Sequence, residues 1–221
     1  MKRLTTILIL SFLSFGVWAQ NAHNDFRLGL TATPTIGWVK PELGKGDGSG
    51  LGFSYGIMGD FNFASNYSFA TALTITTING KSIEPNALPY HQEANGSESK
   101  DYSLKYKMHY LQIPLTIKLK TDKIADLRWY GQFGLSNDFK IGAKQDASVD
   151  GKEIANGRNA SDWTRFYRAG LIIGGGAEYD INEKTSIMAG LSFNNGFTKI
   201  TTNSGNNVRN HYIALNLGVF F

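Results

Sequence analysis

The chain has 221 residues, of which 42% are apolar, 18% are charged and none is cysteine. This length suits one domain with a sizeable interior, and the lack of cysteine excludes disulfides and a lipid-modified N-terminal cysteine. The formal net charge of +4 is spread without a lysine or arginine run or a basic aromatic patch, so nothing favours a nucleic-acid partner.

The first 19 residues have the three parts of a secretory signal peptide. Lys2 and Arg3 form the positive start, residues 7–17 form an apolar core, and residues 17–19 form a cleavage site before Gln20. The alternative, a membrane-anchoring helix, would need an apolar core of ~20 residues, which is longer than this one. We therefore expect a signal peptide over residues 1–19 and one domain over residues 20–221, whose net charge without Lys2 and Arg3 is +2.

From residue 26 onward the chain alternates apolar with small or polar residues, which is the period of an extended strand. In residues 51–63, for example, Leu51, Phe53 and Tyr55 alternate with Gly52 and Ser54. Eight such stretches occur and no convincing helix: residues 26–39, 51–63, 67–79, 104–120, 127–141, 165–179, 185–197 and 211–221. Because the mature chain also lacks an apolar run long enough for a helical span, it can cross a membrane only as a barrel.

Two prolines interrupt these strands, although proline is normally confined to edges, strand starts and bulges. Near Pro114 the apolar phase slips by one residue at residues 109–110. We therefore expect a β-bulge there, which would keep Leu104, Tyr106 and Met108 on the apolar outer face. The sequence offers no comparable explanation for Pro34.

Short and long connections alternate along the chain. The short ones are residues 64–66, 121–126 and 180–184, and the long, polar ones are residues 40–50, 80–103, 143–164 and 198–209. Outer-membrane barrels have this asymmetry, with tight periplasmic turns, longer extracellular loops and an even number of strands. The pattern therefore predicts an all-β, eight-stranded, antiparallel up-and-down transmembrane β-barrel in the cell outer membrane.

Aromatic residues of the apolar face gather near both ends of the strands, as expected where a barrel wall crosses two membrane interfaces. The predicted turn-side girdle comprises Phe26, Phe61, Phe63, Tyr67, Phe69, Trp129, Tyr179 and Phe221, and the loop-side girdle comprises Trp38, Phe53, Tyr55, Phe139, Tyr167, Phe193 and Phe197. The alternative is a soluble eight-stranded barrel with its apolar face inward around a ligand. The loop asymmetry, the girdles and the small residues of the second face disfavour it.

The last strand, residues 211–221, ends on Phe221 and should close the barrel against residues 26–38. It resembles the closing strand of bacterial outer-membrane barrels, whose final aromatic residue is part of the signal that the insertion machinery recognises. With Tyr110-Leu111-Gln112-Ile113-Pro114-Leu115 and the glycine-rich strand end at residues 174–179, the chain resembles the PorT-like outer membrane protein beta-barrel family of Bacteroidetes-type bacteria. That resemblance implies an eight-stranded barrel and, through PorT itself, a link to protein secretion.

Eight charged residues fall on the inner face of the predicted barrel. They are Arg27, Asp60, Lys118, Arg128, Asp138, Lys140, Arg168 and Glu178. Side chains just fill the interior of an eight-stranded barrel, and lone buried charges are costly, so we expect these residues to form a polar network of ion pairs. A small-solute porin is therefore a lesser alternative.

Support for catalysis or metal binding is thin. His91 with Glu93 and Ser97, or alternatively with Ser99 or Asp101, could build a hydrolase or lipid-modifying site, but such residues are common in polar loops. The glycine-rich residues 44–50 lack the spacing of a phosphate-binding loop, and no metal-ligand spacing occurs. We expect no enzyme, no cofactor and no metal.

The loops are then the main functional surface, and residues 80–103 and 143–164 are the longest. We expect a non-enzymatic barrel with a structural, adhesion or assembly role, with an accessory role in secretion as the alternative. Its expected partners are outer-membrane lipid, the insertion machinery and, through the loops, extracellular or secretion-system proteins.

Overall fold

The computed structural model describes residues 26–93, 98–202 and 206–221, so the predicted signal peptide and Ser97 lie outside the described residues. The strands are β1 (Phe26–Pro41), β2 (Lys45–Ala64), β3 (Tyr67–Pro85), β4 (Asp101–Lys120), β5 (Leu127–Val149), β6 (Lys152–Asn159), β7 (Tyr167–Asp180), β8 (Ser186–Gly196) and β9 (Val208–Phe220). The helical turns are α2 (Tyr90–Glu93) and η2 (Ser161–Trp163). No helix among these residues is long and apolar enough to span a membrane.

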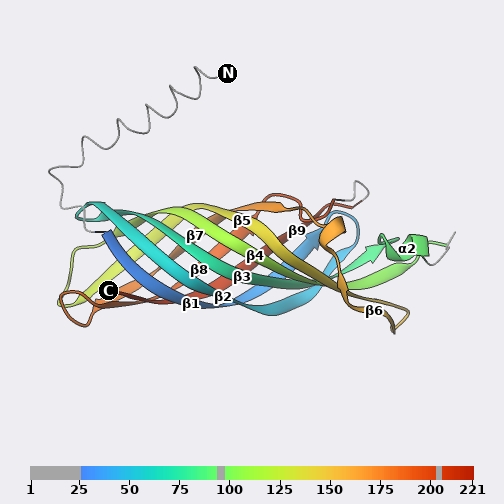
Figure 1. Ribbon diagram of the computed structural model, residues 1–221, viewed down its shortest axis with the longest axis horizontal. Coiled ribbons are helices and arrows are strands. Elements are labelled where there is room, and N and C mark those ends of the chain that lie inside the picture. The colour runs from blue at the N-terminus through green and yellow to red at the C-terminus, as the bar shows by residue number, and fades with distance from the viewer. Residues whose placement is uncertain (1–25, 94–97, 203–205) are drawn as a thin grey trace, which may run out of the picture.

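Eight strands form a closed antiparallel ring in the order β1, β2, β3, β4, β5, β7, β8 and β9. The first and last strands close it, with Leu30 opposite Val219 and Ile36 opposite Ile213. The predicted all-β, eight-stranded, up-and-down barrel and its closing pair are confirmed. In Figure 1 the barrel is elongated, with the start of β1 and the C-terminus at one end, which we call the turn end, and α2 and β6 at the other, the loop end.

Around the half of the barrel nearer the turn end, the outer surface is apolar. Leu30, Ile173 and Leu191 lie on the outer wall and are 55–60% exposed. The aromatic side chains of both predicted girdles also lie outside, where Trp38, Phe69 and Phe139 are half-buried and the others exposed. Small and polar residues alternate with them on the inner face. This surface is the one that a barrel presents to hydrocarbon.

Toward the loop end the pattern is inverted, and here one prediction is wrong. Leu104, Tyr106 and Met108 of β4 point into the barrel and are 1–3% exposed, whereas Lys105 and Lys107 between them face outward. The reason is that β4 keeps a single register with β3 along its whole length, so its phase never slips. Beyond the apolar band the wall faces water, and its apolar residues therefore turn inward.

The predicted bulge exists at the expected place, but on the neighbouring strand. The register between β4 and β5 shifts between His109 and Tyr110, which pair with Gly142 and Lys140 respectively. The extra residue is therefore Ile141 of β5, which is exposed on the outer wall. This bulge changes the phase of β5, so that beyond it Ala143 faces the interior like the apolar residues of β4.

Three of the predicted loops are largely strand. Residues 40–50 form a hairpin whose bend lies at residues 42–44, because β2 begins at Lys45. Residues 80–103 extend β3 and β4, and residues 143–164 contain the end of β5 and all of β6, which pairs with β5. They resemble loops in sequence because their outward residues are polar. In these segments the apolar residues face the interior, whereas in the membrane band they face outward.

Pro34 lies on the outer wall at a gap in the closing ladder. Ala32 pairs with Leu217 and Thr35 with Ala214, but no pairing joins the residues between them, and the register is the same on both sides. Proline lacks the N–H that a ladder hydrogen bond would need. The gap explains how the closing pair of strands accommodates this residue without a bulge.

The two halves of the wall should respond differently to charge. Leu191→Arg, at the middle of the apolar band, should lower the free energy of unfolding by about 2–4 kcal/mol, because it places a cation in hydrocarbon. Ser103→Arg, on the outward face beyond the band, should change it by less than about 0.5 kcal/mol. Urea unfolding in lipid vesicles measures both. Equal losses would contradict the inverted arrangement.

Candidate functional site

The first layer of the interior is an ion-pair cluster near the turn end, which we call the lower charge cluster. Lys118 Nζ lies 2.8 Å from Asp60 Oδ2 and 3.1 Å from Glu178 Oε1. Arg27 Nη2 lies 2.6 Å from Glu178 Oε2, and Lys120 Nζ lies 3.2 Å from Asp60 Oδ2. The five side chains come from β1, β2, β4 and β7, so the cluster joins opposite walls of the barrel.

Two members of this layer were missed by the sequence analysis. Lys120 shares the inner face of β4 with Lys118, so the alternation could have identified it. Phe220 is 1% exposed, and the centre of its ring lies 4.3 Å from Arg27 Cζ and 5.1 Å from Lys118 Nζ. The ring therefore contributes cation–π contacts to a cluster with three cations and two carboxylates.

A second buried ion pair, between Arg168 and Asp138, lies nearer the loop end. Arg168 Nη1 donates to Asp138 Oδ2, and Arg168 Nη2 donates to Asn194 Oδ1 at 2.8 Å. Gln112 Nε2 donates to the other carboxylate oxygen of Asp138 at 2.7 Å and also reaches the hydroxyl of Tyr212 at 2.8 Å. Both side chains are at most 1% exposed, and these additional hydrogen bonds are what a buried pair needs to offset the cost of its desolvation.

A glycine makes room for this pair. A Cβ atom at Gly196 would clash with the main-chain oxygen of Asn210 and come within 2.7 Å of Arg168 Nη2. The absence of a side chain at this position lets β9 and the guanidinium both lie close to β8.

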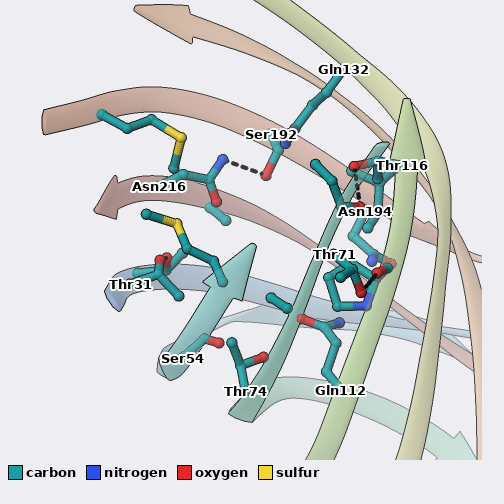
Figure 2. A pocket seen from close by; sticks show the side chains of 18 of the residues that line it. Thr31, Ser54, Thr71, Thr74, Gln112, Thr116, Gln132, Ser192, Asn194 and Asn216 are labelled. Carbon is teal, nitrogen blue, oxygen red and sulfur yellow. Dashed lines mark hydrogen bonds between the residues drawn. The ribbon is translucent and has the colours of Figure 1, made fainter. Parts of the chain in front are cut away.

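Between the two charged layers is a cavity of about 110 Å³ lined mainly by threonine, serine and amide side chains. Figure 2 shows Thr31, Ser54 and Thr74 around it, together with Gln112 and Asn216. Asn216 Nδ2 donates to Ser192 Oγ at 2.9 Å across the wall of β8 and β9. The cavity has room for a few water molecules and is bounded on both sides by ion pairs.

The third layer closes the loop end with apolar and tyrosine side chains. Its buried residues include Val39, Ile78, Tyr102, Leu104, Tyr106, Met108, Tyr110, Ile200 and Val208. Glu84 is buried above them and accepts hydrogen bonds from Ser82 Oγ at 2.6 Å, Tyr106 Oη at 2.8 Å and Asn206 Nδ2 at 2.7 Å. Burial raises the pKa of Glu84. We call this layer the apolar plug.

Of the eight charged residues expected inside, the structure brings six into ion pairs. Arg27, Asp60, Lys118 and Glu178 lie in the lower charge cluster, and Asp138 and Arg168 form the second pair. Arg128 forms no ion pair with a described residue, although it pairs across the strands with Glu178. Lys140 Nζ instead donates to the main-chain oxygens of Ser161 at 2.6 Å and Thr164 at 2.5 Å, which fixes η2 to the wall.

The candidate catalytic group is not assembled among the described residues. Glu93 accepts two hydrogen bonds from Arg158, at 2.6 and 2.5 Å, and His91 lies edge-on to the ring of Tyr102. Within residues 26–93, 98–202 and 206–221, no three His, Asp or Glu side chains gather as metal ligands.

Breaking the Arg168–Asp138 pair by a single substitution should strongly destabilise the barrel. Arg168→Met alone or Asp138→Asn alone should lower the free energy of unfolding by about 3–5 kcal/mol, since each leaves or disrupts a buried polar group. Arg168→Met combined with Asp138→Leu should cost less than the sum of the single changes. Urea titration with tryptophan fluorescence measures these values, and a single-variant loss below about 1 kcal/mol would contradict the role of the pair.

Comparisons with known proteins agree with this architecture. The sequence model of the family described as "Outer membrane protein beta-barrel domain" matches residues 18–201. No curated protein sequence matches the chain.

Solved structures that are similar to the chain include OprG, neisserial surface protein A and Ail. OprG from Pseudomonas aeruginosa is 12% identical with a TM-score of 0.48, over 90% of this chain and 98% of OprG. Neisserial surface protein A is 18% identical with a TM-score of 0.45, over 87% and 95% of the two chains. Ail, the attachment invasion locus protein of Yersinia pestis, is 13% identical with a TM-score of 0.39, over 89% and 99%.

The family match covers most of the chain, including seven of the eight ring strands, and the closed ring with its apolar outer band has the geometry that such a domain requires. The chain belongs to the outer membrane protein beta-barrel domain family and is located in the outer membrane.

Proposed function

We propose that this protein is a non-enzymatic, non-conducting barrel that presents a rigid extracellular β-extension to partners outside the cell, in a structural, adhesion or assembly role. The observation that carries the proposal is the contrast between a filled interior and an extended, packed loop end. An even strand number and short turns at one end favour periplasmic termini, which makes the loop end extracellular.

Cross-strand contacts stiffen the extension. Arg158 of β6 pairs with Glu93 of α2 and lies 4.8 Å from the centre of the Trp163 ring. Lys107 Nζ lies 2.6 Å from Asp146 Oδ2 between β4 and β5. A surface that is already ordered loses little conformational entropy when it binds a partner. A rigid extension therefore suits recognition better than a set of mobile loops.

The layered interior argues against a solute pore. A molecule crossing the barrel would have to displace the lower charge cluster, the Arg168–Asp138 pair and the apolar plug in turn. The first two contain charges that would be left unpaired in a low-dielectric interior, which is costly. The porin alternative therefore requires a different state of the barrel.

An accessory role in secretion is the second candidate, and it rests on the similarity of Tyr110–Leu115 to the PorT-like strand. Unchanged secretion of a reporter cargo after deletion of the gene would remove it. On either reading, export through a signal peptide at residues 1–19 and recognition of Phe221 by the insertion machinery remain parts of our proposal. A lipid-modifying enzyme is a lesser candidate, and an unchanged lipid mass spectrum in a His91→Ala strain would remove it.

Trimming the β5–β6 hairpin should abolish the external role and spare the barrel. Gln145 and Arg158 are cross-strand partners, so an Asn-Gly turn can replace residues 146–157 between them. Cells carrying this variant should lose attachment to surfaces or resistance to envelope stress, while heat-modifiable mobility in detergent gels stays normal. Glu183→Ser with Lys184→Ser, in a periplasmic turn, serves as the control. A trimmed protein that behaves like the wild type in both assays would contradict the proposal.

The closed interior predicts a second measurable property. Purified protein in planar bilayers should show no steady single-channel conductance in 1 M salt, because three side-chain layers fill the lumen. A reproducible open level in the wild-type protein would overturn the non-conducting part of the proposal and favour the porin.

A further inference from the structure

A cleft on the outer wall at the loop end is the most distinctive surface that the proposed function leaves unused. It lies where β7, β8 and β9 leave the apolar band and has a volume of about 770 Å³. We call it the interfacial cleft. Its lining includes Arg165, Phe166, Tyr167, Phe197, Lys199 and Arg209.

Three cations line this cleft without a carboxylate partner. Arg165, Lys199 and Arg209 form no ion pair with any described residue. Among the described residues, their one side-chain hydrogen bond joins Arg165 Nε to the main-chain oxygen of Thr201, at 3.1 Å. Lys40 of β1 lies opposite Arg209 and adds a fourth positive charge next to the cleft. The cleft is therefore strongly positive and suited to an anion.

Arg158 and Lys107, elsewhere on the extension, are each paired with a carboxylate at 2.5–2.6 Å. What distinguishes the cleft is that three cations without such a partner among the described residues gather beside exposed aromatic rings. Arginine side chains also offer the forked donors that match phosphate oxygens.

The aromatic side of the cleft faces the membrane. Phe166 is 65% exposed and Phe197 52% exposed. The ring of Phe139 lies 5.9 Å from that of Phe166 and 5.6 Å from that of Tyr167, which makes a continuous aromatic surface. Large exposed aromatic side chains in this position match the interfacial belt of a membrane protein.

Along the barrel axis, the cations lie at the level expected for lipid headgroups. On β9, Arg209 lies four residues beyond Ile213, an exposed residue of the apolar band. For a tilted strand that separation is about 10 Å along the barrel axis. The cations therefore lie just above the hydrocarbon, while the aromatic rings lie at its boundary.

We propose that the interfacial cleft binds a phosphate-bearing lipid of the outer leaflet. The phosphate lies among Arg165, Lys199 and Arg209, and an acyl chain lies against Phe166 and Phe197. A free phosphate would use the cations alone and leave the aromatic surface without a ligand. This inference does not rest on the proposed role of the β5–β6 hairpin.

The test uses the protein purified in the neutral detergent dodecyl maltoside and titrated with lipid, with bound lipid counted by native mass spectrometry. Three probes separate the sources of affinity: dioleoyl phosphatidic acid, dioleoylglycerol without the phosphate, and inorganic phosphate without the acyl chains. We expect one molecule of phosphatidic acid to bind and each of the other two probes to bind far more weakly.

The decisive variant carries Arg165→Gln, Lys199→Gln and Arg209→Gln. It should bind phosphatidic acid on the order of 100-fold more weakly, since each surface cation contributes to the attraction of an anionic lipid. The matched control, Lys45→Gln with Lys81→Gln and Lys105→Gln, removes three charges from β2, β3 and β4 and should bind nearly as the wild type does. Heat-modifiable mobility verifies folding of both. Lys199→Glu alone, expected to weaken binding about 10-fold, gives an independent measurement if the triple variant misfolds.

Two results would overturn the proposal. Equal losses in the two triple variants would mean a general attraction between a basic surface and anionic lipid. Equal affinity for inorganic phosphate and phosphatidic acid would mean a free-anion site, and Phe166→Ala would then leave lipid binding unchanged instead of weakening it.

Discussion

Hydrocarbon offers no hydrogen-bond partner to a peptide group, and this constraint governs the rest of the structure. Every main-chain N–H and C=O inside the membrane must find a partner in the protein, which for strands requires a closed ring. The pairing of β1 with β9 completes that ring. Even Pro34, which has no N–H, lies where the closing ladder has a gap, so closure is kept without a shift of register.

The same closure determines what the interior can hold. Eight strands enclose a space that side chains fill, so charged residues on the inner face must meet one another. They do so in two separate layers, one around Lys118 and one around Arg168, each linking strands far apart in the chain. The cavity of about 110 Å³ between them is lined mainly by threonine, serine and amide side chains. The barrel is therefore held together from inside by ion pairs and from outside by lipid.

Where the wall leaves the membrane, the solvent changes and the sequence pattern changes with it. Beyond the apolar band, Tyr106 and Met108 face the interior, whereas Lys105 and Lys107 face outward, as in a water-soluble β-structure. The bulge at Ile141 brings β5 into this second arrangement. One consequence is a packed extension beyond the apolar band. Another is a boundary at which exposed aromatic rings meet cations that have no carboxylate partner among the described residues, as in the interfacial cleft.

The sequence by itself determined the fold class, the number and direction of the ring strands and the outward residues of the apolar band, because the two-residue alternation depends only on residues adjacent in the chain. It also indicated which charged residues lie inside, except for Lys120 at the end of β4. The contact of the Phe220 ring with the lower charge cluster was not predicted either. Only the tertiary structure decided which of these charges pair, since partners such as Arg27 and Glu178 are 151 residues apart. It alone showed that the pattern inverts beyond the membrane. The sequence pattern of an apolar residue is the same whether it faces lipid outside the barrel or packs in the interior. Only the closed wall shows which side each residue faces.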